Sequence, residues 1–135
     1  MRATVAIPTY NRIEIFFKTL PYWENQTVKD FEIIVIDDNS TDGTYEIIKN
    51  YRGNLKINVI KNNVNKGSAD GRNKGALFAN SDVIIYTDDD TFPTPEFIEI
   101  HLQYHEKYRN AIVRGPIINF NDLKFLDFFF LKIVF

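Results

Sequence analysis

The chain has no cysteine among its 135 residues. This absence excludes disulfide bridges, thiolate nucleophiles and zinc–thiolate sites, and it fits a reducing compartment such as the cytoplasm. The sequence also lacks a basic block: 16 lysine and arginine residues stand against 18 aspartate and glutamate residues, for a formal charge of −2. The composition therefore gives no indication of a nucleic-acid-binding surface.

Long apolar runs are missing as well. The longest, residues 125–135, is about half of the ~20 residues that a membrane-spanning helix needs. A proline at position 8 comes too early for a secretory signal peptide. We therefore expect one cytoplasmic domain, because a chain of this length buries a core without disulfides or structural metal.

Short apolar runs alternate with segments of helical period along the whole chain, which is the pattern of βαβ units and a mostly parallel sheet. The predicted fold class is α/β. Five strands are predicted, at residues 4–8, 31–36, 56–61, 82–87 and 111–116. Helices are predicted after Asn11 as N-cap, after the segment 40–43, through the glycines that follow position 67, and from Thr94.

The third predicted helix has an unusual composition, because Gly67, Gly71, Gly75 and Ala79 recur every four residues. Each interior glycine costs about 1 kcal/mol relative to alanine. The stripe indicates either close packing on the sheet or close approach of a ligand, and both can hold.

The run Ile84 to Thr87 leads directly into Asp88, Asp89 and Asp90. Three adjacent carboxylates at the end of a buried strand are costly to desolvate unless positive charge or hydrogen-bond donors meet them. If the strand continued, Asp88 and Asp90 would point together at one cation and Asp89 would point away.

Polar residues follow other strands too, and ligands of open parallel sheets bind beyond the carboxyl ends of strands. Tyr10 can stack on a base, Asp38 can accept from a ring N–H, and Asp88 or Asp90 can hold a hard cation. Arg72 can meet phosphate charge. Together these side chains suit a nucleoside diphosphate, although each also has a simpler role at a solvated loop, a sheet edge or a helix surface. His101 and His105 are interpreted as a polar helix face, because the zinc-protease pattern is absent.

Four motifs occur in order, at residues 5–12 (VAIPTYNR), 34–44 (IVIDDNSTDGT), 65–75 (beginning NKG and ending RNKG) and 88–90 (DDD). In this order they resemble the family 2 glycosyltransferases, over nearly all of residues 3–117. The resemblance implies a Rossmann-like GT-A three-layer fold and transfer of a sugar from a nucleotide-sugar donor, UDP-sugar being favoured, to a saccharide or lipid-linked acceptor with inversion. It also implies Mg²⁺ or Mn²⁺ as cofactor.

The same resemblance assigns site residues. Thr9, Tyr10 and Asp38 would contact the base, Arg72 the donor nucleotide, Asp88 the ribose side, and Asp90 the metal. The full nucleotide-binding set comprises Pro8, Thr9, Tyr10, Arg12, Asp38, Gly67, Arg72, Asp88 and Asp89. The metal ligands are Asp90 and Asp88, with Asp89 a weaker candidate.

The general base is not identified, because Asp122 and Asp127 lack the acidic-pair context that the family leads us to expect. We predict a nucleotide-sugar-binding core at residues 1–117 and an apolar tail at 118–135, the start of a short or missing acceptor region. The tail would pack in a core, associate with another chain, or contact a membrane surface. A catalytically inactive nucleotide-sugar-binding module is the alternative function.

Other families with an acidic strand end fit less well. A receiver domain would need a hydroxyl residue on strand 111–116, and a haloacid-dehalogenase-type phosphatase would need its acidic motif on the first strand. Sugar-phosphate nucleotidyltransferases carry a glycine-rich, arginine-bearing loop after the first strand, which is absent here.

Overall fold

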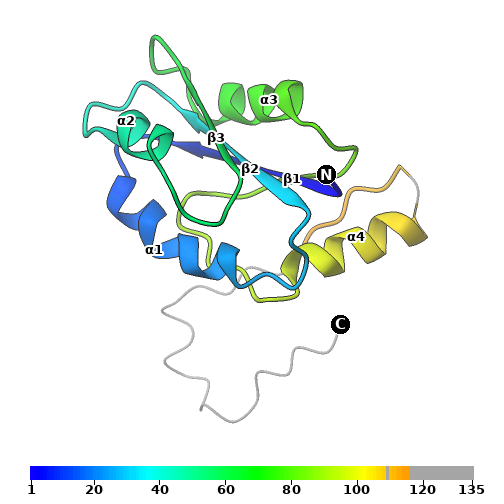
Figure 1. The fold of residues 1–135 in the computed structure, drawn as a ribbon. Coiled ribbons are helices and arrows are strands. Elements are labelled where there is room, and N and C mark those ends of the chain that lie inside the picture. The colour runs from blue at the N-terminus through cyan, green and yellow to red at the C-terminus, as the bar shows by residue number, and fades with distance from the viewer. Residues whose placement is uncertain (109, 116–135) are drawn as a thin grey trace, which may run out of the picture.

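The computed structural model describes residues 1–108 and 110–115. Four parallel strands form one sheet in the order β3-β2-β1-β4 (Figure 1). The strands are β1 (Ala3–Thr9), β2 (Phe31–Asp37), β3 (Ile57–Lys61) and β4 (Ile84–Tyr86). The helices are α1 (Ile13–Glu24), α2 (Thr44–Lys49), α3 (Ser68–Phe78) and α4 (Phe97–Lys107).

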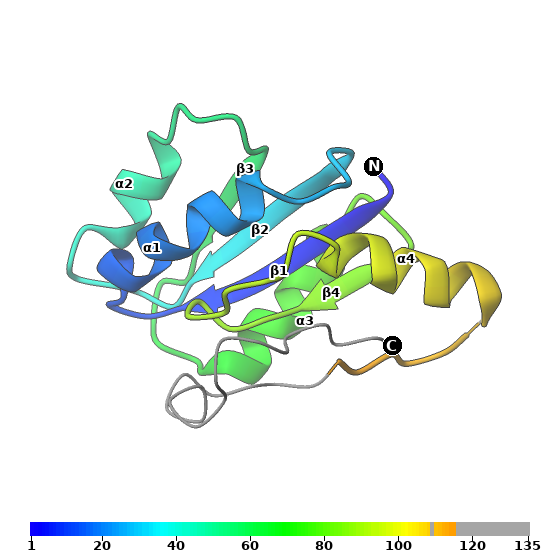
Figure 2. The same ribbon diagram turned by 90° about the horizontal axis from the view of Figure 1, so that it is seen from below.

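The sheet is the middle of three layers. Helix α3 covers one face, while α1, α2 and α4 lie on the other (Figures 1 and 2). The central strands are buried on both faces, which explains why they read as continuous apolar runs. Alternate residues of β1 and β2, such as Val5 and Ile33, join Phe16, Trp23 and Ile98 in the main hydrophobic core.

The glycine stripe packs against the opposite face of the sheet. A Cβ atom added at Gly75 would lie 2.5 Å from the Cβ of Ala6, and one added at Gly71 would lie 2.8 Å from the Cβ of Pro8. The predicted close packing is therefore confirmed for these two glycines. Gly67 instead precedes the helix, with a φ of 82° that favours glycine.

The structure corrects two local predictions. Residues 111–115 of the predicted fifth strand form no strand, and Ile112 is fully exposed. An extended segment becomes a strand only with a hydrogen-bonded neighbour, and among the described residues β4 pairs only with β1. Asn11 is not the N-cap of α1: Arg12 takes that place, and Asn11 adopts a φ of 53° with its side chain turned toward Thr41.

In the described part of the chain, no helix combines the length and apolar character needed to cross a bilayer. The predicted tail, residues 118–135, lies outside the described residues.

Candidate functional site

The carboxyl ends of three strands meet at one rim of the sheet. Thr9 and Asp37 are partners in the register of β1 and β2, and the next residue, Asp38, donates its N–H to the carbonyl of Thr9 at 2.9 Å. Beyond β4, Thr87 donates its N–H to the carbonyl of Ala6 at 3.2 Å. The segments that carry Tyr10, Asp38 and the three aspartates therefore begin side by side, as the rule for parallel sheets predicts.

Asp89 is the buried member of the aspartate triplet, at 4% exposure. Its Oδ2 accepts a hydrogen bond from the Thr9 hydroxyl at 2.7 Å, and its Oδ1 lies 3.3 Å from a guanidinium nitrogen of Arg12. Burial raises the pKa of Asp89, and so do the adjacent carboxylates of Asp88 and Asp90. The hydrogen bond from Thr9 and the charge of Arg12 lower the pKa but do not outweigh these effects. This side chain joins the ends of β1 and β4.

Asp88 and Asp90 face solvent and pair with different arginines. The Arg12 guanidinium donates to Asp90 at 2.8 Å, and the Arg72 guanidinium donates to Asp88 at 2.8 Å. Arg72 is further held by the Ser68 hydroxyl at 3.1 Å. The hydrogen bond to Asp90 raises the pKa of Arg12. The positive charge that the triplet was expected to need is supplied here by two arginines.

The orientation of the triplet is partly as predicted. Asp89 is separated from Asp88 and Asp90, but strand alternation is not the cause, because β4 ends at Tyr86 and Asp89 and Asp90 lie in a turn. The turn directs Asp89 inward and leaves its two neighbours exposed.

Asp38 is buried and accepts three hydrogen bonds. Asn62 and the Lys66 N–H donate to Oδ1 at 2.7 and 2.8 Å, and the Gly67 N–H donates to Oδ2 at 2.7 Å. Burial would raise the pKa of Asp38, but these donors outweigh it and the pKa is lowered. Asp38 thus fixes the loop before α3, and one lone pair of Oδ2 remains for a further donor such as a base N–H.

Sequence reasoning missed Asn62, which is 1% exposed and directly follows β3. Besides Asp38, its amide donates to Asp70 at 3.1 Å, and its carbonyl oxygen accepts from Lys74. The rule that pointed to the other strand ends also applies to this position, so the signal was present. Asp37 beside it is fully buried, and its Oδ2 has no hydrogen-bond partner among the described residues.

Tyr10 lies on the same rim and its side chain is 46% exposed. The residues on either side of it are held by hydrogen bonds. The carbonyl of Thr9 accepts from the Asp38 N–H at 2.9 Å, the N–H of Asn11 donates to the Ser40 hydroxyl at 2.9 Å, and the Asn11 side chain accepts from the Thr41 N–H at 2.7 Å. An exposed aromatic ring on a fixed loop is available for stacking. Pro8, two residues before Tyr10, packs against Gly71 of α3.

A divalent cation fits the donor chemistry of Asp88 and Asp90. Each carboxylate has one oxygen on an arginine and a second oxygen without a partner within residues 1–108 and 110–115. Mg²⁺ and Mn²⁺ take oxygen ligands, and such ions commonly use one or two carboxylates together with substrate phosphates. No three acidic or histidine side chains converge on a common point within those residues, so these residues alone would supply only part of the coordination sphere.

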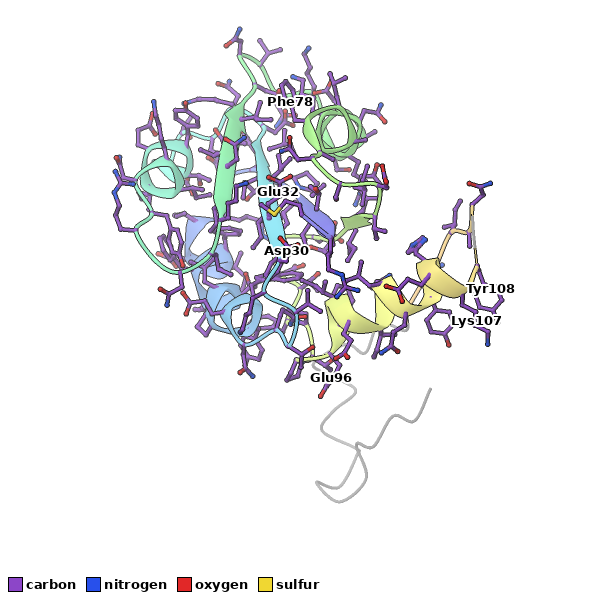
Figure 3. The ribbon with its side chains drawn as sticks, turned by 45° about the vertical axis from the view of Figure 1, so that its right-hand side comes forward. Asp30, Glu32, Phe78, Glu96, Lys107 and Tyr108 are labelled. Carbon is purple, nitrogen blue, oxygen red and sulfur yellow. The ribbon has the colours of Figure 1, made fainter. Side chains whose placement is uncertain are left out.

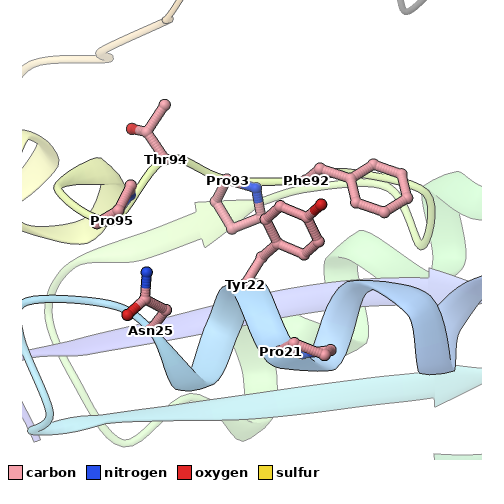
Figure 4. A pocket seen from close by; sticks show the side chains of 7 residues that line it. All are labelled: Pro21, Tyr22, Asn25, Phe92, Pro93, Thr94 and Pro95. Carbon is pink, nitrogen blue, oxygen red and sulfur yellow. The ribbon is translucent and has the colours of Figure 1, made fainter.

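A surface depression of about 620 Å³ lies beside the loop that follows Asp90. Tyr22 and Phe92 meet there edge to face at 5.1 Å between ring centroids. Figure 4 shows the lining, which comprises Pro21, Tyr22, Asn25, Phe92, Pro93, Thr94 and Pro95. None of the predicted nucleotide-binding residues is among them, so the predicted donor site does not lie in this depression.

The loop beside this depression is anchored to the end of α1 by a buried amide. Gln26 donates to the carbonyl of Thr94 at 2.7 Å and accepts from the N–H of Ile98 at 3.1 Å. Together with the Thr9–Asp89 bond, these contacts fix both ends of the segment that carries Asp90.

Comparisons with known proteins find similar sequences and similar folds. The family model described as "Glycosyl transferase family 2" matches residues 4–129. The uncharacterized glycosyltransferase YfnE of Bacillus subtilis is 31% identical over 116 residues, which is 85% of this chain and 30% of that protein. Validoxylamine A glucosyltransferase of Streptomyces hygroscopicus subsp. jinggangensis is 33% identical over 105 residues, 76% of this chain and 25% of that protein.

Two solved structures are similar in fold. TarS 1-349 of S. aureus in complex with UDP gives a TM-score of 0.72 at 25% identity, over 85% of this chain and 38% of that one. The mannosyltransferase PcManGT from Pyrobaculum calidifontis, in complex with GDP-Man and Mn²⁺, gives 0.64 at 27% identity, over 70% and 29%. The chain therefore spans less than half the length of these relatives.

Proposed function

The chain belongs to glycosyl transferase family 2 and has a GT-A fold, and from that premise we propose that it carries the donor-binding part of a metal-dependent, inverting glycosyltransferase. The donor would be a nucleotide diphosphate sugar. A UDP-sugar is favoured, since a similar structure holds UDP, although another similar structure holds GDP-Man. The acceptor would be a saccharide or a lipid-linked saccharide.

One observation carries this proposal: hydrogen bonds link the ends of β1, β2 and β4 into a single rim. Thr9 accepts from Asp38 through its carbonyl at 2.9 Å and donates to Asp89 through its hydroxyl at 2.7 Å. These links support a site in which an aromatic side chain, a hydrogen-bond acceptor and two exposed carboxylates would reach one small molecule. That set of groups supports recognition of a base, a ribose and a diphosphate.

Each side chain would act by binding or orienting the donor. Tyr10 would stack on the base, the free lone pair of Asp38 would accept from its ring N–H, and Arg72 would meet phosphate oxygens. Asp90 and Asp88 would hold Mg²⁺ or Mn²⁺, and Asp89 would keep the turn in place through Thr9. A bound cation supplies charge compensation for the diphosphate leaving group.

The acceptor side of the reaction is not assigned to residues. An inverting displacement needs a general base opposite the leaving group. Asp122 and Asp127 lie outside the described residues, as does the tail proposed for membrane contact or self-association. Because the base is unassigned, a nucleotide-sugar-binding module without turnover of its own is the second candidate. The lack of cysteine supports a cytoplasmic location for either.

Calorimetry tests the donor site directly. UDP, GDP and dTDP are titrated into the protein with and without Mn²⁺, and we expect metal-dependent binding that is strongest for UDP. Asp90→Asn should weaken UDP binding in Mn²⁺ by about tenfold or more, because a metal ligand is lost. Asp82→Asn is the matched control, since Asp82 is an exposed aspartate two residues before β4, beyond its opposite end. Absence of metal-dependent heat from folded protein would disprove the assignment.

A further inference from the structure

Arg12 contacts two carboxylates of the triplet at once. One guanidinium nitrogen lies 2.8 Å from Asp90 and the other lies 3.3 Å from Asp89. The two partners differ in burial: the Asp89 side chain is 5% exposed and that of Asp90 is 45% exposed. Arg12 is therefore anchored on a buried carboxylate and reaches out to an exposed one.

The exposed partner is the carboxylate proposed to bind the cation. A cation approaching Asp90 meets a guanidinium that already neutralises it. Asp88, the other proposed ligand, is covered in the same way by Arg72 at 2.8 Å. A metal ion bound to Asp88 or Asp90 would lie close to a guanidinium of the same charge, and the two would repel. A metal ion that binds without a nucleotide must therefore compete with both arginines for the carboxylate oxygens.

The described residues also offer a metal ion few other ligands. Within the described residues, no group of three acidic or histidine side chains is arranged to hold a cation. A nucleoside diphosphate would supply the missing ligands and also relieve the competition with the arginines. Its phosphate oxygens can coordinate the metal and can accept hydrogen bonds from a displaced guanidinium.

From these contacts we infer that Arg12 is an internal counter-ion of Asp90 that makes metal binding dependent on the nucleotide. Without nucleotide, Arg12 pairs with Asp90 and cation affinity is low. When a diphosphate enters, the guanidinium leaves Asp90 for phosphate oxygen while keeping its contact with Asp89. The inference rests on the proposed donor site and adds to it a coupling between the binding of nucleotide and the binding of metal. The coupling is reciprocal, so the metal must raise nucleotide affinity by the same factor as the nucleotide raises metal affinity.

The test measures Mn²⁺ binding in the absence of any nucleotide. Arg12→Gln removes the guanidinium from Asp90, and we expect Mn²⁺ alone to bind about three- to tenfold more tightly than to the wild type. The ratio between UDP affinities with and without Mn²⁺ should shrink in this variant. Arg52→Gln is the charge-matched control, because Arg52 is exposed and its guanidinium contacts only the carbonyl of Tyr51 among the described residues.

A second, more conservative variant keeps the test informative if Arg12→Gln does not fold. Arg12→Lys keeps a positive charge beside Asp89, but a single ammonium cannot bridge two carboxylates as the guanidinium fork does. It should therefore also tighten binding of Mn²⁺ alone, by a smaller factor. Thermal melts of both variants establish that the protein measured is folded.

The outcomes separate this inference from the proposed function. Unchanged or weaker binding of Mn²⁺ alone to both folded Arg12 variants, with metal-dependent UDP binding by the wild type, overturns the counter-ion role and leaves the donor site standing. Absence of metal-dependent UDP binding by the wild type overturns the donor site itself, and the counter-ion role with it.

Discussion

Buried carboxylates lie at both ends of the parallel sheet, and two of them, Glu32 and Asp89, have different partners. At the amino end lies Glu32 of β2, which is labelled in Figure 3. It is 2% exposed and accepts from the Thr4 hydroxyl at 3.0 Å and from the Asn80 amide at 2.9 Å. At the carboxyl end, Asp89 is 4% exposed and has Thr9 on one oxygen and Arg12 on the other.

The two carboxylates differ in whether their hydrogen-bonding partners can move away to bind another anion. The donors to Glu32 are neutral groups of the sheet and of the loop before β4, and its nearest cation, Lys56, is 3.9 Å away. At the carboxyl end, Asp89 and its neighbour Asp88 instead pair with arginines whose side chains are 40–48% exposed and can exchange one anion for another. We expect changes at the amino end to affect folding and changes at the carboxyl end to affect binding.

The largest expected effect is at the amino end. Glu32→Ala leaves the Thr4 hydroxyl and the Asn80 donors without their acceptor, and should reduce the free energy of unfolding by about 3 kcal/mol. Urea unfolding measures this loss, and UDP affinity of the folded variant in Mn²⁺ should be unchanged.

The matched control is Glu46→Ala, which removes a side chain that is 64% exposed and lies 3.8 Å from Lys61. Its effect should stay within about 0.5 kcal/mol. A Glu32→Ala variant as stable as this control would show that the comparison of the two ends is wrong.

Two glycines of α3 allow the same comparison between folding and binding, because they lie at different distances from the carboxyl end of the sheet. Alanine at Gly75 or Gly71 places a methyl group 2.5 Å from Ala6 or 2.8 Å from Pro8, and each change should cost about 2 kcal/mol through overpacking. Gly71→Ala should also weaken UDP binding severalfold, because Gly71 adjoins Arg72 and presses on the residue before Thr9.

Gly75 lies one helical turn farther from the rim, so Gly75→Ala should lower stability with little change in UDP affinity. Gly115→Ala is the control, since no described residue lies within 4 Å of the added methyl group. Equal loss of UDP affinity in both helix variants would contradict the separation of folding and binding.

The sequence predicted the features that depend on periodicity. All four strands of the sheet were predicted to within about two residues, and the position of polar groups at their ends followed from the parallel arrangement. For the glycine stripe, the sequence left open whether the glycines allow close packing on the sheet or close approach of a ligand. The distances from Gly71 and Gly75 then showed close packing on β1.

Features that depend on loop conformation were not predictable. Asn11 and Asn39 adopt φ values of 53° and 67°, which no pattern in the sequence indicates, and these turns set where the β1–α1 and β2–α2 loops run. The pairing of Arg12 with Asp90 joins residues 78 positions apart through two such loops. The inward turn of Asp89 likewise depends on where β4 ends, and strand ends are the least certain part of a sequence-based prediction.

The smallest expected effect concerns the pH dependence of stability. Burial would raise the pKa of Glu32, but hydrogen bonds from Asn80 and Thr4 outweigh it and the pKa is lowered. An unfolded glutamate has a pKa of about 4.3, so the unfolded state binds the proton first as the pH falls. The stability that Glu32 contributes is therefore complete above about pH 5 and declines as the pH falls toward the lower folded value.

Glu32→Gln isolates this contribution, because glutamine keeps the size of the side chain and cannot titrate. The difference in unfolding free energy between wild type and variant should be constant from pH 7 to about pH 5 and should then shrink as the pH falls further. Urea unfolding at pH 7, 5, 4 and 3.5 measures it, with Glu46→Gln correcting for the loss of one exposed carboxylate. A difference that does not change with pH would mean that Glu32 is held by packing alone, and that the amino end does not depend on an ionised carboxylate.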